Sequence, residues 1–316
     1  MASTLRLPGT DLREKHFPKM SKKLFTIALA AALLPLACFA NDAPTDAPAV
    51  PSEEPAKPPD SADWWQKSSF AFSPTLTRFL FHVDGTLSYM NAQGNTSGNS
   101  FYGASSFEVR KQRWTNRFVA ELTHKNLVYG FGGGSVDFTE NTLREELERD
   151  LNKRLLVVAG IEDYRNTMIF IDKRLTSYGG LGAEVFKNER QQVNLVGGLG
   201  FVNFGFDEAA MLRVNPAETA TLPGFAPSTG GGMGREEWRW RLPREITLTQ
   251  SASYMKLFRS SLGHLWTLGL VGDIPFAKKL SIAIAYRIND EDNIYIDALQ
   301  VKVQDRTFTT GIKISM

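Results

Sequence analysis

The stretch Phe-Tyr-Gly-Ala-Ser-Ser-Phe-Glu-Val-Arg, residues 101–110, decides the fold because its apolar and polar side chains alternate. In an extended chain Phe101 and Phe107 fall on one side, and Glu108 and Arg110 fall on the other. A period of two residues is typical of a β-strand with one apolar face, whereas an amphipathic helix repeats every 3.6 residues. The stretch therefore predicts a strand.

The same alternation recurs from residue 64 to the C-terminus. It predicts about twelve strands, near residues 76–91, 98–112, 114–128, 135–150, 153–165, 172–187, 190–206, 234–242, 245–257, 261–273, 279–289 and 305–316. The fourth segment also suits a short amphipathic helix, because Leu143, Leu147 and Leu151 recur at helical spacing. We expect a strand there, since the neighbouring strands need a partner.

The connections between these strands alternate in length. Tight turns are predicted at Arg113, Asn152-Lys153, Asn188-Glu189-Arg190, Pro243-Arg244 and Ile274–Lys278. Longer connections are predicted at 129–134, 166–171, 207–233 and 290–304, while the first hairpin, at 94–98, is compact. Short turns at one end and longer loops at the other are typical of an outer-membrane barrel.

We therefore predict an all-β fold, a transmembrane antiparallel up-and-down β-barrel of about twelve strands. A soluble periplasmic β-protein is the alternative, because it would show the same alternation with its apolar side turned inward. Charged residues of both signs on the polar side favour the membrane barrel. Those predicted to face its lumen are Arg110, Arg117, Glu121, Arg144, Glu184, Arg239, Arg241, Arg287 and Lys313.

Two different segments precede the strands. Residues 1–40 are predicted to be a leader with a secretory signal peptide that starts at Met20, contains the apolar run 24–36 and is cleaved after Ala40. Residues 41–63, rich in Pro, Ala and acidic residues, predict a disordered tether. Residues 64–316 are left for the barrel, which implies a location in the outer membrane with a periplasmic N-terminal tether.

Composition excludes several kinds of chemistry. The single cysteine, Cys38, lies in the leader, so the remaining chain has no thiol for a disulfide, a cysteine zinc site or a nucleophile. Beyond residue 40 there are 30 Lys/Arg against 32 Asp/Glu, which does not favour binding to nucleic acid. We expect no cofactor and no metal ion.

Several short segments carry a resemblance to a known family: 85–89, 94–96, 111–114, 180–183, 195–201 and 245–251. They resemble the salt-induced outer membrane protein family (YdiY-like), a domain of unknown function. The resemblance implies a Gram-negative outer-membrane barrel, expression linked to salt or envelope stress, and no catalytic residues. The sequence differs from most outer-membrane barrels at its last residue, which is Met316 instead of Phe or Trp.

The leading functional hypothesis is a monomeric envelope component, with a narrow pore as its more specific form. Its expected partners are outer-membrane lipid, lipopolysaccharide and the barrel-assembly machinery. An enzyme acting on lipid or lipopolysaccharide is the alternative, which directs attention to His82, His124 and His264. His82 has the same parity as Asp84, whose carboxylate is able to orient an imidazole.

Two further patterns are explained more simply by ordinary loops and strands than by a binding site. Acidic residues at 290, 291, 292 and 297 form a weak candidate for a divalent cation in an outward loop, although their spacing fits no calcium-binding loop. Glycine triplets at 132–134 and 230–232 are expected at loop tips, and the glycines between 179 and 200 are expected inside strands.

Overall fold

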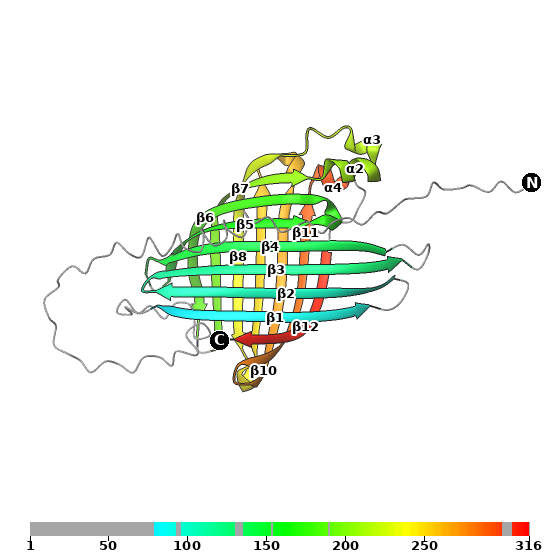
Figure 1. Ribbon diagram of the computed structural model, residues 1–316. Coiled ribbons are helices and arrows are strands. Elements are labelled where there is room, and N and C mark those ends of the chain that lie inside the picture. Colours follow the sequence, from blue (N-terminus) through cyan, green and yellow to red (C-terminus); the bar gives the residue numbers. More distant parts are fainter. Residues whose placement is uncertain are drawn as a thin grey trace, which may run out of the picture. The chain divides into compact units, whose positions relative to one another are not determined.

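Twelve antiparallel strands form a closed barrel in the computed structural model, which describes residues 79–92, 96–129, 135–152, 154–188, 190–298 and 305–315. Each strand pairs with the next along the chain, and β1 pairs with β12 (Figure 1). The strands are β1 (Leu80–Ala92), β2 (Thr96–Lys111), β3 (Trp114–Tyr129), β4 (Ser135–Asp150), β5 (Leu155–Asn166), β6 (Ile171–Lys187), β7 (Gln191–Phe206), β8 (Ser228–Arg241), β9 (Thr247–Leu257), β10 (His264–Ala277), β11 (Leu280–Asp292) and β12 (Asp305–Ser315).

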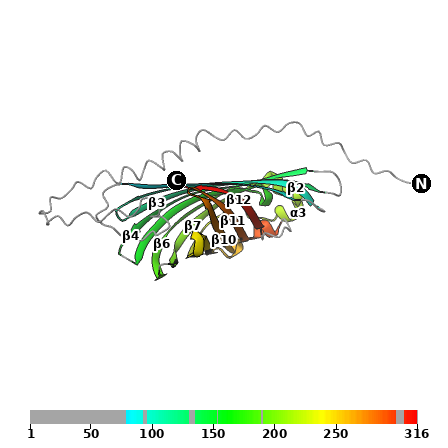
Figure 2. The same cartoon turned by 90° about the horizontal axis from the view of Figure 1, so that it is seen from below.

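The predicted fold class is confirmed. Seen from below, the strands curve round from β3 and β4 through β6 and β7 to β10, β11 and β12 (Figure 2). None of the helices in the described residues is long and apolar enough to cross a membrane. The predicted leader, tether and C-terminal residue lie outside the described part of the chain.

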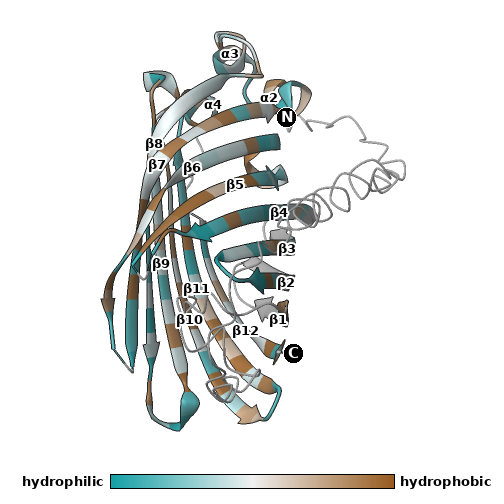
Figure 3. Ribbon diagram, turned by 90° about the vertical axis from the view of Figure 1, so that its left-hand side faces the viewer, coloured by the Kyte–Doolittle hydropathy of each residue, from teal (hydrophilic) through white to brown (hydrophobic). Residues whose placement is uncertain are grey.

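Apolar side chains lie on the outer side of the barrel, and the inner side is mostly polar apart from a buried apolar cluster that includes Val202 and Phe204. On β1, Leu87 is 63% exposed while its neighbour Ser88 is 6% exposed. On β2, Phe101 and Phe107 are exposed and Arg110 is buried, as the sequence pattern predicts. Hydropathy consequently alternates along the strands (Figure 3). The premise of the soluble alternative, an inward apolar face, is therefore wrong.

The fourth strand is extended throughout. β4 pairs with β3 over Ser135–Arg149 and with β5 over Glu140–Asp150, so ladders and not helical bonds satisfy its backbone groups. The three leucines do not mark a helical face, because Leu143 faces outward between Ala120 and Asp163 of the neighbouring strands and Leu151 follows the end of β4. The expectation of a strand is confirmed and the helical alternative is wrong.

The tight turns gather at one end of the barrel, which we call the turn end. Asn152 and Asn188 each begin such a turn, and each side-chain Oδ1 accepts hydrogen bonds from backbone N–H groups two and three residues later, at 2.7–2.9 Å. Asparagine favours turns through this local bond. The last turn is shorter than predicted, because Ile274–Ala277 belongs to β10.

The opposite end, which we call the loop end, carries short helices. These are η1 (Thr167–Ile169), α2 (Glu208–Val214), α3 (Pro216–Thr219), η3 (Ser260–Leu262) and α4 (Ile294–Asp297), while η2 (Pro243–Glu245) lies in a turn at the turn end. Two predicted loops are wrong in part. Residues 228–233 are the start of β8, and residues 290–292 are the end of β11.

Glycines allow two strands to approach closely inside the barrel. Gly180 on β6 is opposite Gly198 on β7, and a Cβ atom added to Gly198 would lie 2.2 Å from the Gly179 carbonyl oxygen. The outward-facing Gly197 next to it has nothing within 4 Å. The expectation that these glycines lie in strands is confirmed, whereas Gly230–Gly232 lie in β8 and not at a loop tip.

Candidate functional site: the interior of the barrel

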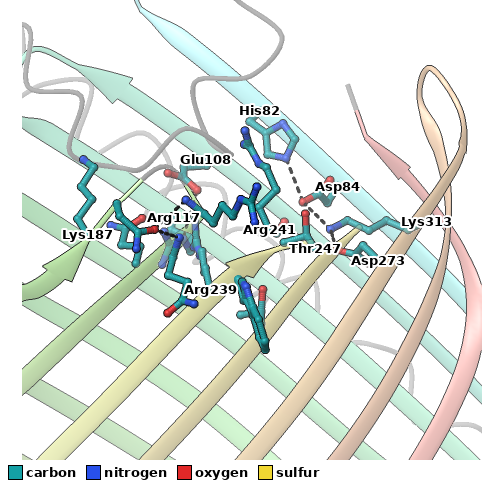
Figure 4. A pocket seen from close by; sticks show the side chains of 17 residues that line it. His82, Asp84, Glu108, Arg117, Lys187, Arg239, Arg241, Thr247, Asp273 and Lys313 are labelled. Carbon is teal, nitrogen blue, oxygen red and sulfur yellow. Dashed lines mark hydrogen bonds and ion pairs between the residues drawn. The ribbon is translucent and has the colours of Figure 1, made fainter. Parts of the chain in front are cut away.

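The interior contains a large cavity at the turn end. Its volume is about 660 Å³, and its wall comes from β1, β2, β3, β8, β9, β10, β12 and the ends of β6 and β7 with the turn between them (Figure 4). The cationic side chains in this wall are Arg117, Lys187, Arg190, Arg239, Arg241 and Lys313, and the carboxylates are Asp84, Glu108 and Asp273. We call this space the turn-end cavity.

A cluster of charged groups joins the first and last strands in this cavity. Lys313 Nζ on β12 lies 2.9 Å from Asp273 Oδ2 on β10 and 3.5 Å from Asp84 Oδ2 on β1. His82 Nε2 lies 3.0 Å from Asp84, and Ser315 Oγ donates to Asp84 Oδ1 at 2.6 Å. The cluster ties three strands together at the seam where the barrel closes.

A layer of ion pairs forms the floor of the turn-end cavity. We call it the ion-pair layer and define it as Arg117, Glu146, Glu148 and Arg235. Glu146, which is 2% exposed, receives hydrogen bonds from both terminal nitrogens of Arg235 and, at 2.6 Å, from Tyr178 Oη. Arg117 Nη1 lies 3.7 Å from Glu146 and 3.9 Å from Glu148. The layer connects β3, β4 and β8 across the interior.

A second cavity, of about 230 Å³, lies beyond this layer toward the loop end. Arg287 on β11 donates two hydrogen bonds, of 2.5 and 2.7 Å, to Glu121 on β3. Arg174 Nη1 on β6 donates to Glu291 Oε2 at 2.6 Å, and its guanidinium carbon lies 4.1 Å from the centroid of the Tyr164 ring. These pairs also reach across the interior, because β11 is adjacent to neither β3 nor β6.

An apolar cluster caps the second cavity at the loop end. Tyr295 of α4 is fully buried and stacks on Phe206 of β7 with 4.4 Å between ring centroids. Met211 of α2 is also fully buried in this cluster. Asn215 Nδ2 donates to the Ala298 carbonyl at 2.8 Å and so links the two loops. Burial raises the pKa of the Tyr295 phenol.

All nine residues predicted to face the lumen have side chains on the inner side, but they do not form one site. Four belong to the ion pairs described above: Arg117, Glu121, Arg287 and Lys313. Arg239 Nε lies 2.8 Å from Glu237. Arg110 pairs with Asp150 at 2.8 Å, and Glu184 accepts from Gln192 at 2.9 Å. Arg144 lines the second cavity and Arg241 lines the turn-end cavity.

The histidines are not brought together. His82 is buried beside Asp84 inside the barrel, as its parity predicts. His124 is half exposed near the loop end of β3, 3.9 Å from Asp137, and His264 begins β10 between Asp290 and Asp292. In the described ranges no group of three His, Cys, Asp or Glu residues is placed to hold a metal ion. Glu291 instead pairs with Arg174.

The most important interior residue outside the predicted set is Arg235. It lies inside the strand predicted at 234–242 and has the same parity as Arg239 and Arg241. In β8 the side chains of Arg235, Glu237, Arg239 and Arg241 therefore lie on one face. This alternation is the sequence signal that identifies Arg235 as an interior residue.

The protein family model for DUF481, a protein of unknown function, matches residues 85–315. The chain belongs to the DUF481 family. The match starts within β1 and ends in β12, so the DUF481 region is the barrel itself. It is consistent with the resemblance to salt-induced outer membrane proteins. No curated protein matches the sequence.

Several solved structures are similar to this DUF481 barrel at low identity. A bacterial polysaccharide outer membrane secretin has a TM-score of 0.39 and 9% identity, covering 75% of this chain and 97% of that chain. The NanC porin has a TM-score of 0.39 and 9% identity over 74% and 97%. The translocator domain of the autotransporter NalP from Neisseria meningitidis has a TM-score of 0.38 and 10% identity over 93% and 96%. Because these scores are below 0.5, the fold assignment rests on the strand pairing described above.

Proposed function

We propose that this protein is an outer-membrane β-barrel that provides a narrow, normally closed pathway for solutes. Support for the membrane location comes from its outer surface, where side chains such as Leu87, Leu199 and Ile312 are more than half exposed. In lipid, a barrel satisfies its backbone hydrogen bonds internally because it has no free edge. The strands, of 11 to 17 residues, are long enough to supply the roughly 9–11 tilted residues that cross the hydrocarbon.

The pathway is supported by one observation, that three cavities follow one another inside the barrel. A cavity of about 20 Å³ shares Arg117 with the turn-end cavity and Arg235 with the second cavity. Both shared residues belong to the ion-pair layer. A solute would therefore have to separate Arg117 and Arg235 from Glu146 in order to pass.

The size of the barrel fits a closed pathway. Barrels of eight strands are filled by side chains, whereas those of about 16–18 strands hold aqueous channels. Twelve strands give an intermediate interior, which this chain fills with ion pairs and, at the loop end, with apolar side chains. We expect a low conductance with brief openings.

The cellular role is part of the same proposal. The resemblance to salt-induced proteins supports a Gram-negative envelope component whose expression responds to salt, and the predicted signal peptide supplies the export route. Its partners are then outer-membrane lipid, lipopolysaccharide and the barrel-assembly machinery, and the protein acts as a monomer.

Planar-bilayer recording tests the pathway. The double variant E146Q/R235Q removes the central ion pair without leaving one partner charged alone, and we expect it to raise the open probability or the unit conductance. The matched control, D163N/R165Q, removes a pair on the outer face of β5 and should behave like the parent. If the parent and both double variants are silent in bilayers, the pathway is wrong.

The contact of His82 with Asp84 keeps the enzyme alternative testable, because a carboxylate orients an imidazole in acyl-transfer sites. Under this alternative the purified protein releases fatty acid from lipid, and H82A abolishes that activity. Full activity of H82A, or no activity of the parent, would exclude His82 as the base.

A further inference from the structure

We infer that the second cavity, between the ion-pair layer and the apolar cluster at the loop end, is a binding site for a small neutral polyol or monosaccharide. The inference deepens the proposed function, because it names the class of solute that the pathway would hold, and it rests on that proposal only for the route of entry. It is drawn from polar groups in the cavity wall that have no hydrogen-bond partner among the described residues.

Three side chains of the cavity wall lie at one level on neighbouring strands. The strand registers place Arg144 of β4 opposite Glu162 of β5, and Glu162 opposite Thr176 of β6. All three residues line the cavity. Since neighbouring strands lie roughly 4.8 Å apart, the backbones of Arg144 and Thr176 are about 10 Å apart, with Glu162 between them. One small molecule is therefore able to contact the whole row.

This part of the wall presents polar groups that nothing engages. Within the described part of the chain Arg144 makes no hydrogen bond or ion pair, and carboxylates such as Glu121 and Glu146 act on it only through longer-range electrostatics. Thr176 is 7% exposed, and its Oγ1 atom is buried without a partner. The same is true of the Nε atom of Arg174, two residues earlier on the same face of β6. A solute with oxygen atoms would satisfy these groups, which are costly to bury unpaired.

The carboxylates of the wall are engaged already. Glu162 and Glu291 both accept hydrogen bonds from Arg174, at 3.3 and 2.6 Å. Glu121 accepts two from Arg287. Because the unengaged nitrogen atoms are donors, the solute has to supply hydrogen-bond acceptors.

The charge of the wall favours a neutral solute. Four arginines line the cavity, at positions 144, 174, 235 and 287, against five carboxylates, at positions 121, 140, 162, 290 and 291, which leaves a formal charge of −1. An anion would add negative charge to this wall, and a cation would meet donors. Hydroxyl groups accept and donate hydrogen bonds without either cost.

The size of the cavity and its apolar side chains fit a small carbohydrate. Its volume of about 230 Å³ equals that of about eight water molecules at roughly 30 Å³ each. The ring of Tyr178 lies over Gly160, and Ile169, Met233 and Met255 add apolar surface to the wall. Ligand sites combine apolar surface of this kind with a few polar groups that fix orientation. The C–H groups of a sugar ring suit the apolar side, and its hydroxyl groups suit the row of polar residues.

Isothermal titration calorimetry of the full protein, in a zwitterionic detergent without a sugar headgroup, tests the inference. Glycerol, myo-inositol and glucose are the neutral probes, and citrate is the anionic comparison. We expect saturable binding of at least one neutral probe and weaker binding of citrate. T176V removes a hydroxyl group but keeps the shape of the side chain, and should weaken the binding about threefold or more. R144Q should weaken it about tenfold or more, because hydrogen bonds from a charged group are stronger.

Each variant has a matched control on the outer face of the barrel. T310V changes an exposed threonine of β12, and R149Q changes an exposed arginine of β4. Both controls should keep the parent affinity. The inference is overturned if no neutral probe binds the folded protein, if citrate binds more tightly than every neutral probe, or if T176V and R144Q lose no more affinity than their controls.

Binding and conduction are able to fail separately. Binding needs only one end of the second cavity to open, whereas conduction needs both ends to open. A protein that binds a neutral probe but passes no current would refute the pathway and support the site. A protein that passes current but binds none of the probes would overturn the site and support the pathway.

Discussion

Glu146 on β4 and Arg235 on β8 meet across the interior of the barrel, where Arg235 Nη2 lies 3.0 Å from Glu146 Oε1. The two strands are separated by three others in the sheet, so this contact spans the interior and does not merely join neighbours. It places an ion pair between the two large cavities, so the pair obstructs the proposed pathway.

Removing only one partner of this pair should destabilise the barrel. E146A leaves Arg235 and Arg117 with Glu148, 3.9 Å from each, as the only carboxylate that they share. Breaking a buried pair in this way costs about 3–5 kcal/mol. Urea unfolding in detergent micelles, followed by tryptophan fluorescence, measures the loss. E146Q/R235Q should lose less unfolding free energy than E146A. An equal loss would show that the two charges do not stabilise each other.

The Glu121–Arg287 pair should show a coupling energy of its own. A double-mutant cycle with E121Q, R287Q and the double variant is expected to give about 0.5–3 kcal/mol, as found for residues in direct contact. Unfolding free energies in the same micelles provide the measurement. A coupling energy of zero would mean that the two hydrogen bonds do not persist in solution.

The close approach of β6 and β7 should make Gly198 intolerant of a side chain. G198A forces a Cβ against the Gly179 carbonyl and is expected to cost about 1–3 kcal/mol, the usual range for overpacking. G197A is the matched control, because its added methyl group points into open space on the outer face. Equal unfolding free energies for the two variants would contradict this packing.

The loop-end cap should depend on the Tyr295 ring and not on its hydroxyl. Y295A is expected to cost about 3–5 kcal/mol if the cap unfolds with the barrel, as other buried aromatic residues do. In the described residues the Tyr295 hydroxyl is buried without a hydrogen-bond partner, so Y295F should be neutral or stabilising. Protease resistance of the loop end and urea unfolding distinguish the two variants.

The same residue gives a pH prediction. Burial raises the pKa of Tyr295 above its ordinary value near 10, so the folded protein holds this proton more tightly than the unfolded chain does. The stabilisation that this tighter proton binding provides is complete below pH 10. It is lost as the pH rises through the pKa that Tyr295 has in the folded protein. The parent should therefore lose stability relative to Y295F above pH 10. If the free energies of unfolding of the two proteins changed with pH in parallel, the raised pKa would be contradicted.

The alternation of side chains accounts for how well the fold is predicted from the sequence. Leu87 and Ser88 show the reason, since in a strand two adjacent residues face opposite sides and the pattern alone assigns them. Parity does not say which side of the sheet faces the interior of the barrel; the positions of Arg110, Glu121 and Arg287 inside the closed barrel decide that. Strand ends are less predictable where glycine-rich or acidic stretches have the sequence pattern of a loop, as near Ser228 and Asp290.

The interior contacts were only partly predictable for a different reason. Parity places Glu146 on the inner side, but its pairing with Arg235 depends on how far each strand is shifted along its neighbours. Those shifts accumulate around the barrel and are not encoded in any short segment. The cap is similar, because Tyr295 and Phe206 are 89 positions apart and meet only after the barrel closes.

The central claim is that these strands form a closed barrel with its apolar side toward lipid, and electrophoretic mobility tests it most directly. The protein extracted from membranes in detergent is run with and without boiling. A compact barrel predicts a faster unboiled band that slows after heating, together with a requirement for detergent. A single band in both lanes from a protein that stays in solution without detergent would contradict the claim.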